Sequence, residues 1–232
     1  MLSNLPISLP IFFGLTTALT IFLFLKSVET PPQYKTVLGV LIGWSVLQMA
    51  ISWAGFYQKT DTLPPRFLLA VVPTLLLIIG LFSSKKGQKF TESLDLKALT
   101  YLHVVRIPVE LTLLWLFQHD TIPEVMTFEG RNFDIFSGIT APFIAYFGFT
   151  KKTLSSTIII VWNVLCLILL FNIVITAALS VQTPLQQMSF DRPNRAVLFF
   201  PFVWLPSVVV PLVLFAHLVV LKRLSKNEVM PS

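Results

Sequence analysis

Seven long apolar segments, separated by short polar loops, constrain this chain more than any other feature of its sequence. They cover residues 6–25, 37–57, 65–83, 98–118, 133–149, 156–181 and 197–221. A helix needs roughly 20 residues to cross the hydrocarbon core of a bilayer, and most of the segments reach that length. The segments are continuously apolar instead of alternating, which argues against a transmembrane β-barrel. The sequence therefore predicts an all-α, polytopic transmembrane helical bundle of about seven spans.

The amino-acid composition is incompatible with a water-soluble fold. Hydrophobic residues make up 55% of the chain and charged residues 12%, with a mean hydropathy of +0.79. A soluble protein covers its surface with polar side chains, and the apolar segments contain too few of them. The short loops leave no room for a second domain, so residues 1–232 are predicted to form a single integral membrane domain. Because no cleavable signal is recognisable, the first segment is expected to remain as a span.

The two shortest segments leave a second topology open. The third and fifth segments reach the required length only if flanking residues such as Pro65, Asn132 and Phe133 are included. Six spans and a re-entrant segment are therefore an alternative to seven spans.

The distribution of lysine and arginine predicts the orientation. When the loops are assigned alternately to the two sides, one side collects eleven of these residues: Lys26, Lys35, Lys85, Lys86, Lys89, Lys97, Lys151, Lys152, Lys222, Arg223 and Lys226. The other side collects five: Lys59, Arg66, Arg131, Arg192 and Arg195. The positive-inside rule then places the N-terminus outside and the C-terminus in the cytoplasm. The short loops favour a bacterial inner membrane, and no basic stretch has the aromatic interleaving of a nucleic-acid surface, so no nucleic-acid partner is expected.

One predicted span contains an unusual group of ionisable residues. His103, Arg106 and Glu110 lie within an arc of about 60° on a helix, and they must face away from lipid. Arg106 and Glu110 are four residues apart and are expected to pair along the helix. Pro108 lies between them, and because it lacks an N–H it is expected to kink the helix at this depth. These residues are the candidate ligand or proton site.

Two interpretations of this cluster remain open. Ionisable residues inside a membrane are functional candidates by default. A buried ion pair can also fix the packing of helices without any further function. The sequence does not choose between the two.

Other predicted spans supply uncharged polar residues that are candidates for lining the same site: Gln48, Asn163, Asn172 and His217. Asn and Gln also commonly bridge transmembrane helices, so a structural role is the simpler interpretation for each. His103 and His217 are expected at similar depth, where two histidines can hold a haem axially. No haem-attachment motif accompanies them, and we expect no cofactor.

The loops on the predicted outer side are rich in charged residues that form a predicted external mouth: Asp120, Glu124, Glu129, Asp134, Arg192 and Arg195. The two arginines are expected to pair with the acidic loop. Asn132 or Asp134 is alternatively a cap for the fifth helix. The spacing matches no metal-ligand motif, so no metal site is predicted.

Three functions agree with these features. The first is a small-molecule or proton-coupled transporter in which Glu110 changes protonation. The second is a membrane-embedded enzyme with Glu110 or His103 as general acid or base toward a lipidic substrate. The third is a non-catalytic membrane subunit. The expected partners are the lipid bilayer and a small-molecule or lipid ligand, and the sequence does not set the oligomeric state.

Overall fold

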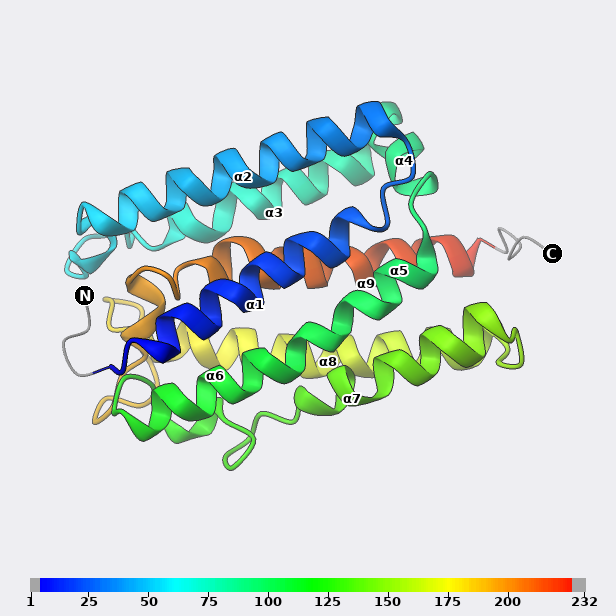
Figure 1. The fold of residues 1–232 in the computed structure, drawn as a ribbon. Helices are drawn as coiled ribbons and strands as arrows, with labels where there is room; N and C mark the ends of the chain where they lie inside the picture. The colour runs from blue at the N-terminus through cyan, green and yellow to red at the C-terminus, as the bar shows by residue number, and fades with distance from the viewer. Residues whose placement is uncertain (1–4, 227–232) are drawn as a thin grey trace.

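Helices make up nearly all of the regular structure in the computed structural model, which describes residues 5–226 (Figure 1). These residues contain no β-strand. The α-helices are α1 (Ser8–Leu25), α2 (Pro31–Trp53), α3 (Leu68–Ser83), α4 (Lys85–Glu92), α5 (Leu96–Leu102), α6 (Arg106–Gln118), α7 (Ile135–Ile144), α8 (Ser156–Ser180) and α9 (Val210–Ser225). A 3₁₀ turn, His103–Val105, joins α5 to α6, and π-helical turns extend α7 over Ala145–Thr150 and precede α9 over Leu205–Val209. The predicted all-helical class is confirmed.

Five helices in the described chain are long and apolar enough to cross a membrane. They are α1, α2, the continuous α5–α6 segment (Leu96–Gln118), α8, and α9 with its π turn (Leu205–Ser225). The pair α3 and α4, which is bent by 89°, is a sixth crossing if it counts as one broken span. The shorter apolar segment Ile135–Thr150 contains α7. The third and fifth predicted segments, which are short in the sequence, thus correspond to the bent α3–α4 pair and to the short α7 segment.

Local sequence signals explain where several helices begin. The side chains of Ser84, Asp95 and Ser155 accept hydrogen bonds from backbone N–H groups in the first turns of α4, α5 and α8. These contacts satisfy donors that have no partner within the helix. Helix α2 begins at Pro31, earlier than the apolar pattern predicts, because proline needs no N–H partner in a first turn.

The last helix begins later than the apolar pattern predicts. The predicted segment starts at residue 197, but residues 196–198 form a 3₁₀ turn and regular helical structure resumes at Leu205. Pro201 falls in this stretch and Pro206 in the π-helical turn that follows it, and each removes one backbone donor. A hydropathy pattern does not register this interruption.

The helices run side by side along one long axis (Figure 1). Helices α2 and α3 form one side of the bundle, α1 and α9 lie in the middle, and α5, α6, α7 and α8 form the other side. The first described turn of α1 and the last turn of α9 lie at opposite ends.

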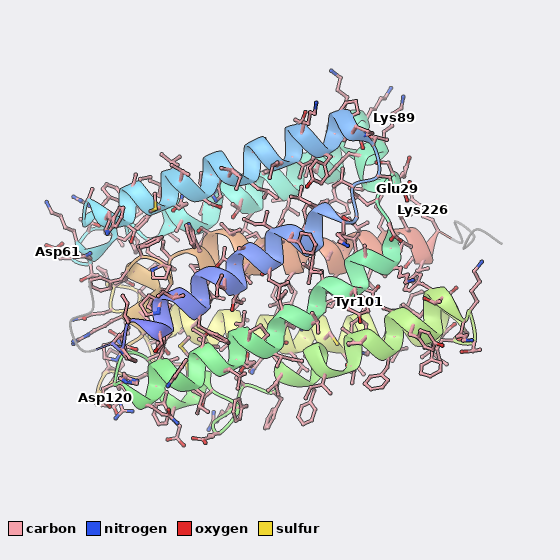
Figure 2. The ribbon with its side chains drawn as sticks, in the orientation of Figure 1. Glu29, Asp61, Lys89, Tyr101, Asp120 and Lys226 are labelled. Carbon is pink, nitrogen blue, oxygen red and sulfur yellow. The ribbon has the colours of Figure 1, made fainter. Side chains whose placement is uncertain are left out.

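Large apolar side chains cover the outer faces of the bundle (Figure 2). On α8, Leu165 and Ile168 are 57% and 58% exposed, and on α3 Leu76 and Ile79 are 61% and 60% exposed. A surface of this extent is stable in hydrocarbon and not in water. Together with the long apolar helices, it makes the chain an integral membrane protein.

Candidate functional site

The three ionisable residues that the sequence singles out in the α5–α6 segment face the interior of the bundle. His103, Arg106 and Glu110 have exposed fractions of 0%, 2% and 1%. His103 starts the 3₁₀ turn and Arg106 starts α6, two residues before Pro108. The proline cannot donate a hydrogen bond, and the helix tightens into the 3₁₀ form one turn earlier, near the predicted kink.

Arg106 forms its ion pair with Asp134, across two helices. Its Nη1 atom lies 2.6 Å from Asp134 Oδ1 and also donates to the Cys166 carbonyl oxygen at 3.2 Å. The expected pairing of Arg106 with Glu110 along the helix is therefore wrong. Asp134, which the sequence places at the external mouth, is 4% exposed and lies inside the bundle. An arginine reaches a carboxylate on a facing helix with better geometry than one on its own helix in the less favourable order.

His217 extends the polar contacts of Arg106 from α6 to α8. Arg106 Nη2 lies 2.9 Å from His217 Nε2, and His217 Nδ1 lies 2.8 Å from Asn163 Oδ1. Guanidinium is only a donor, so Nε2 must accept the hydrogen bond and the ring proton must be on Nδ1. Asn163 then donates through Nδ2 to the carbonyl oxygen of Ile159 at 2.9 Å. This hydrogen-bond chain holds His217 as a neutral imidazole.

His103 packs on His217 and has no hydrogen bond among the described residues. The two imidazole centroids are 3.8 Å apart and the ring planes differ by 18°. Trp162 packs edge-on against His103 with a centroid distance of 5.7 Å. A haem held axially between two histidines needs its macrocycle between the rings, and directly stacked rings leave no such space. The geometry is thus incompatible with the haem arrangement considered from sequence.

Glu110 is held by the amide of Asn132 and not by a cation. Asn132 Nδ2 lies 2.6 and 2.7 Å from the two carboxyl oxygens of Glu110 and 3.1 Å from the Met126 carbonyl oxygen. Asn132 Oδ1 accepts from the backbone N–H of Asp134 at 3.1 Å. We refer to His103, Arg106, Glu110, Asn132, Asp134, Asn163 and His217 as the polar centre. It contains two carboxyl groups and one guanidinium.

A cavity of about 130 Å³ adjoins the two carboxyl groups. Glu110, Asp134 and Asn194 line it together with apolar side chains of α6 and α8 and of the segments around Val197 and Leu205. Asn194 is 1% exposed, and its Oδ1 has no hydrogen-bond partner in the described chain. Hydrogen-bond acceptors of three residues therefore border a space with otherwise apolar walls. We call this space the polar-centre cavity.

Helix α7 approaches α6 closely where Arg106 meets Asp134. A Cβ atom on Gly138 would lie 2.8 Å from Ile107 Cγ1 and 3.0 Å from the Ile107 backbone nitrogen. Only glycine permits this separation, and it places the start of α7 beside Arg106. Residues 127–134, which are not α-helical, lead to this point: Glu129 is exposed, and the chain then enters the bundle at Asn132 and Asp134. Irregular backbone at membrane depth is tolerated where protein surrounds it or where it lines a cavity.

Other predicted site residues lie away from the polar centre. Gln48 is buried but accepts a hydrogen bond from the Tyr57 hydroxyl at 2.6 Å. Asn172 is exposed and donates to the Arg131 carbonyl oxygen at 3.0 Å. Of the four predicted lining residues, Asn163 and His217 thus belong to the polar centre, whereas the hydrogen bonds of Gln48 and Asn172 lead elsewhere.

The predicted external mouth is partly present. Arg192 Nη2 pairs with Asp120 Oδ1 at 2.5 Å, as expected for the two loops. Arg195 joins the same loops through its backbone N–H, which donates to the Thr121 carbonyl oxygen at 3.0 Å. Glu124 and Glu129 are exposed. Within residues 5–226, no group of three or more His, Cys, Asp and Glu side chains is arranged to hold a metal ion.

Asn132 and Asp134 belong to the polar centre, but the sequence did not predict them there. They were assigned to a cap or to the external mouth because they follow a charged loop. The short fifth segment contained the missing signal: if Asn132 and Phe133 must be included to complete a span, their neighbour Asp134 lies at membrane depth. A carboxylate there needs a cation, and Arg106 is the one permanent cation that lies away from the ends of a predicted span.

Comparison with known proteins adds a family but no activity. No curated protein matches the chain, and no solved structure matches it. Residues 64–225 match a domain of unknown function, DUF8737. The matched region covers more than half of the chain and includes every residue of the polar centre, and this protein therefore belongs to the DUF8737 family.

Proposed function

We propose that the polar centre is the proton and substrate site of a small-molecule transporter, with Glu110 as the group that changes protonation. The balance of charges is the observation that carries this proposal. Arg106 already has Asp134 as an ion-pair partner, whereas Glu110 is held by the neutral amide of Asn132. A buried carboxylate without a cation is unfavourable, so a proton or a cationic group is required to neutralise it.

The surroundings of Glu110 support the same proposal. The polar-centre cavity gives a small ligand a place beside both carboxyl groups, and its lining includes Phe67, Val181 and Asn194 near the loops that follow α2 and α8. Interrupted helices at membrane depth are common at the binding sites of secondary transporters. Here the irregular segment before α7 and the 3₁₀ turn before α6 both meet at Arg106.

We infer a topology of seven spans, with α3 and the α7 segment as short spans. The start of α1 and the end of α9 lie at opposite ends of the bundle, as expected for an odd number of crossings (Figure 1). Lys89 and Lys226 lie at one end of the bundle, and Asp61 and Asp120 at the other (Figure 2). By the positive-inside rule, the lysine-rich end is cytoplasmic and the N-terminus is outside. A bacterial inner membrane is the proposed location, since most of the chain is membrane-embedded and the loops are short.

Substitution of Glu110 by glutamine tests the role in proton transfer, because it keeps the side-chain shape and removes the ionisable group. Purified protein is reconstituted into liposomes that contain a pH-sensitive dye, and proton flux is followed after a pH step. We expect Glu110→Gln to reduce flux to the level of protein-free liposomes with an unchanged melting temperature. Glu124→Gln, in an exposed loop, is the matched control and should retain wild-type flux.

Two results would contradict the transport proposal. Wild-type proton flux in Glu110→Gln would show that Glu110 carries no proton across the bundle. Lost flux accompanied by a large fall in melting temperature would instead support a structural role, as expected for a non-catalytic membrane subunit.

A membrane-embedded enzyme acting on a lipidic substrate is the second candidate. The apolar walls of the polar-centre cavity favour it, because they would accommodate a hydrocarbon group next to a carboxyl that acts as general acid or base. Mass spectrometry of lipids incubated with the protein distinguishes the two candidates. A chemically altered lipid that disappears with Glu110→Gln supports the enzyme, whereas unaltered lipids with Glu110-dependent proton flux support the transporter.

A further inference from the structure

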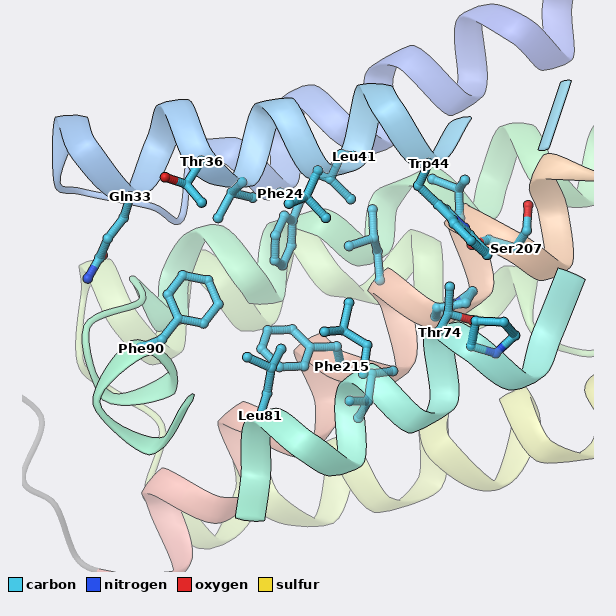
Figure 3. Close-up of a pocket in the computed structure, with 18 of the residues that line it drawn as sticks. Phe24, Gln33, Thr36, Leu41, Trp44, Thr74, Leu81, Phe90, Ser207 and Phe215 are labelled. Carbon is cyan, nitrogen blue, oxygen red and sulfur yellow. The ribbon is translucent and has the colours of Figure 1, made fainter. Parts of the chain in front are cut away.

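A second and larger cavity lies between the α2–α3 pair and the rest of the bundle (Figure 3). Its volume is about 540 Å³, within the range of roughly 300–1,000 Å³ that is usual for ligand sites. Residues of α1, α2, α3, α4 and α9 line it, among them Phe24, Leu41, Trp44, Phe90 and Phe215. We call it the α2–α3 cavity. It shares no lining residue with the polar-centre cavity.

At the deep end of the α2–α3 cavity, the polar side chains of Trp44, Ser207 and Thr74 already donate their hydrogen bonds to backbone carbonyl oxygens. Trp44 Nε1 donates to the Ser207 carbonyl oxygen at 2.9 Å, the Ser207 hydroxyl donates to Val203, and the Thr74 hydroxyl donates to Val71. Nearly all other lining side chains are apolar. Because a buried polar group without a partner is costly, the part of a ligand that enters this cavity must be hydrocarbon.

The length of the cavity corresponds to one leaflet of a bilayer. Gln33 and Phe90 lie at one end, and Trp44, Thr74 and Ser207 lie at the other (Figure 3). Along α2, Trp44 follows Gln33 by eleven positions, which corresponds to a rise of about 16 Å. This is about half of the roughly 30 Å hydrocarbon core. The cavity therefore extends from the α4 end of the bundle to the middle of the membrane.

Cations gather at the α4 end. Helix α4 turns by 89° from α3 and buries Gly87 and Thr91, while Lys85, Lys86 and Lys89 remain exposed. Its Phe90 ring stacks on Phe215 at a centroid distance of 6.3 Å and so faces the cavity. An amphipathic helix with this division of residues is suited to lie at the membrane surface, with its lysines at the level of lipid headgroups.

We propose that the α2–α3 cavity binds one acyl chain of an anionic phospholipid from the leaflet at the α4 end, with the headgroup at Lys85, Lys86 and Lys89. Lys222, in the last turn of α9, adds a further cation at this end. Its Nζ lies 5.3 Å from the centre of the Phe82 ring and has no hydrogen-bond partner in the described chain, so its charge is available to a headgroup. The apolar depth of the cavity selects the chain, and the lysines select the charge of the headgroup. This site does not depend on the function proposed for Glu110.

Trp44 is a built-in reporter for an acyl chain in the cavity, because it lines the deep end. Purified protein is reconstituted into phosphatidylcholine vesicles that contain a minor fraction of either brominated phosphatidylglycerol or brominated phosphatidylcholine. Bromine atoms on the acyl chain quench nearby tryptophan fluorescence. The Trp44 contribution is the quenching that is lost in Trp44→Phe. We expect this contribution to be several-fold larger with the brominated anionic lipid than with the brominated zwitterionic lipid.

Two matched pairs of variants test the two parts of the site. Val37→Phe fills the cavity and should remove the Trp44 quenching, whereas Val46→Phe, on the outer face of the same helix, should not. Changing Lys85, Lys86 and Lys89 to Gln should lower the preference for the anionic lipid about tenfold or more. The same change at Lys97, Lys151 and Lys226, which lie elsewhere at the same end, should leave that preference intact.

Either of two outcomes would overturn the proposal. Equal quenching of Trp44 by the two brominated lipids would show that no anionic lipid is selected. Equal behaviour of Val37→Phe and Val46→Phe would show that the quenching comes from bulk lipid around the bundle. If Val37→Phe does not fold, the surface lysine variants still decide the outcome, because they leave the core unchanged.

Discussion

Arg106 organises the polar centre because it makes three polar contacts through two nitrogen atoms. Asp134, Cys166 and His217 lie on three different parts of the chain, and all of them contact its guanidinium group. The planar guanidinium donates in several fixed directions, which a lysine ammonium does not. Replacement by lysine is therefore not conservative at this position.

Two ion pairs in this protein permit a direct comparison of buried and exposed pairing. Asp134→Asn should lower the free energy of unfolding by about 3–5 kcal/mol, because it leaves Arg106 buried without its counter-charge. Asp120→Asn breaks the loop pair with Arg192, and we expect a loss of only about 0.2–1 kcal/mol, because the Asp120 side chain is 74% exposed. Equilibrium unfolding in detergent measures both. Equal losses would mean that Asp134 does not neutralise Arg106.

At the scale of helices, the length and position of the apolar runs predicted the bundle but not the contacts inside it. Apolar runs located a helix at each predicted segment, and the shared face of His103, Arg106 and Glu110 was predicted because it follows from helix geometry alone. The partners of these residues come from distant segments, through the path that residues 127–134 take into the bundle. Apolar runs and helix geometry contain no information about that path, so the predicted place of Asp134 at the external mouth is wrong.

The close contact of α7 with α6 can be tested with alanine. Gly138→Ala places a Cβ against Ile107, including its backbone nitrogen, so α7 must move away from α6. We expect a loss of about 1–3 kcal/mol in the free energy of unfolding, as for other overpacked contacts. Gly43 on α2 has no atom within 4 Å of an added Cβ, and Gly43→Ala should be neutral or stabilising by up to about 1 kcal/mol. Destabilisation of both variants to the same extent would contradict the role of this contact.

For the whole molecule, the bundle combines an apolar exterior with a largely apolar core that encloses the polar centre. The α2–α3 cavity and the polar-centre cavity lie in different parts of it and have different linings. The sequence predicted that most of the surface faces lipid, because composition and run length determine that property. The sequence predicted a polar site beside Glu110 but not the α2–α3 cavity, and it did not predict the full lining of either, since each lining depends on how several helices pack against one another.

The proposed orientation can be measured with single cysteines in right-side-out membrane vesicles. Cys166, the one cysteine of the chain, is first replaced by alanine, and cysteine is then introduced by Asp61→Cys or Lys89→Cys. A membrane-impermeant maleimide should label the Asp61→Cys protein and not the Lys89→Cys protein, because these positions lie at opposite ends of the bundle (Figure 2). The reverse labelling pattern would invert the topology, and labelling of both positions would contradict a crossing between them.

The side chain of Asn132 connects Glu110 on α6 with the start of α7. Its Nδ2 atom holds Glu110, and its Oδ1 atom holds the backbone N–H at the start of α7. Both atoms belong to one rigid amide plane, so the side chain cannot rotate toward one contact without rotating away from the other. The position of an entire helix is in this way mechanically linked to a single carboxyl group on its neighbour.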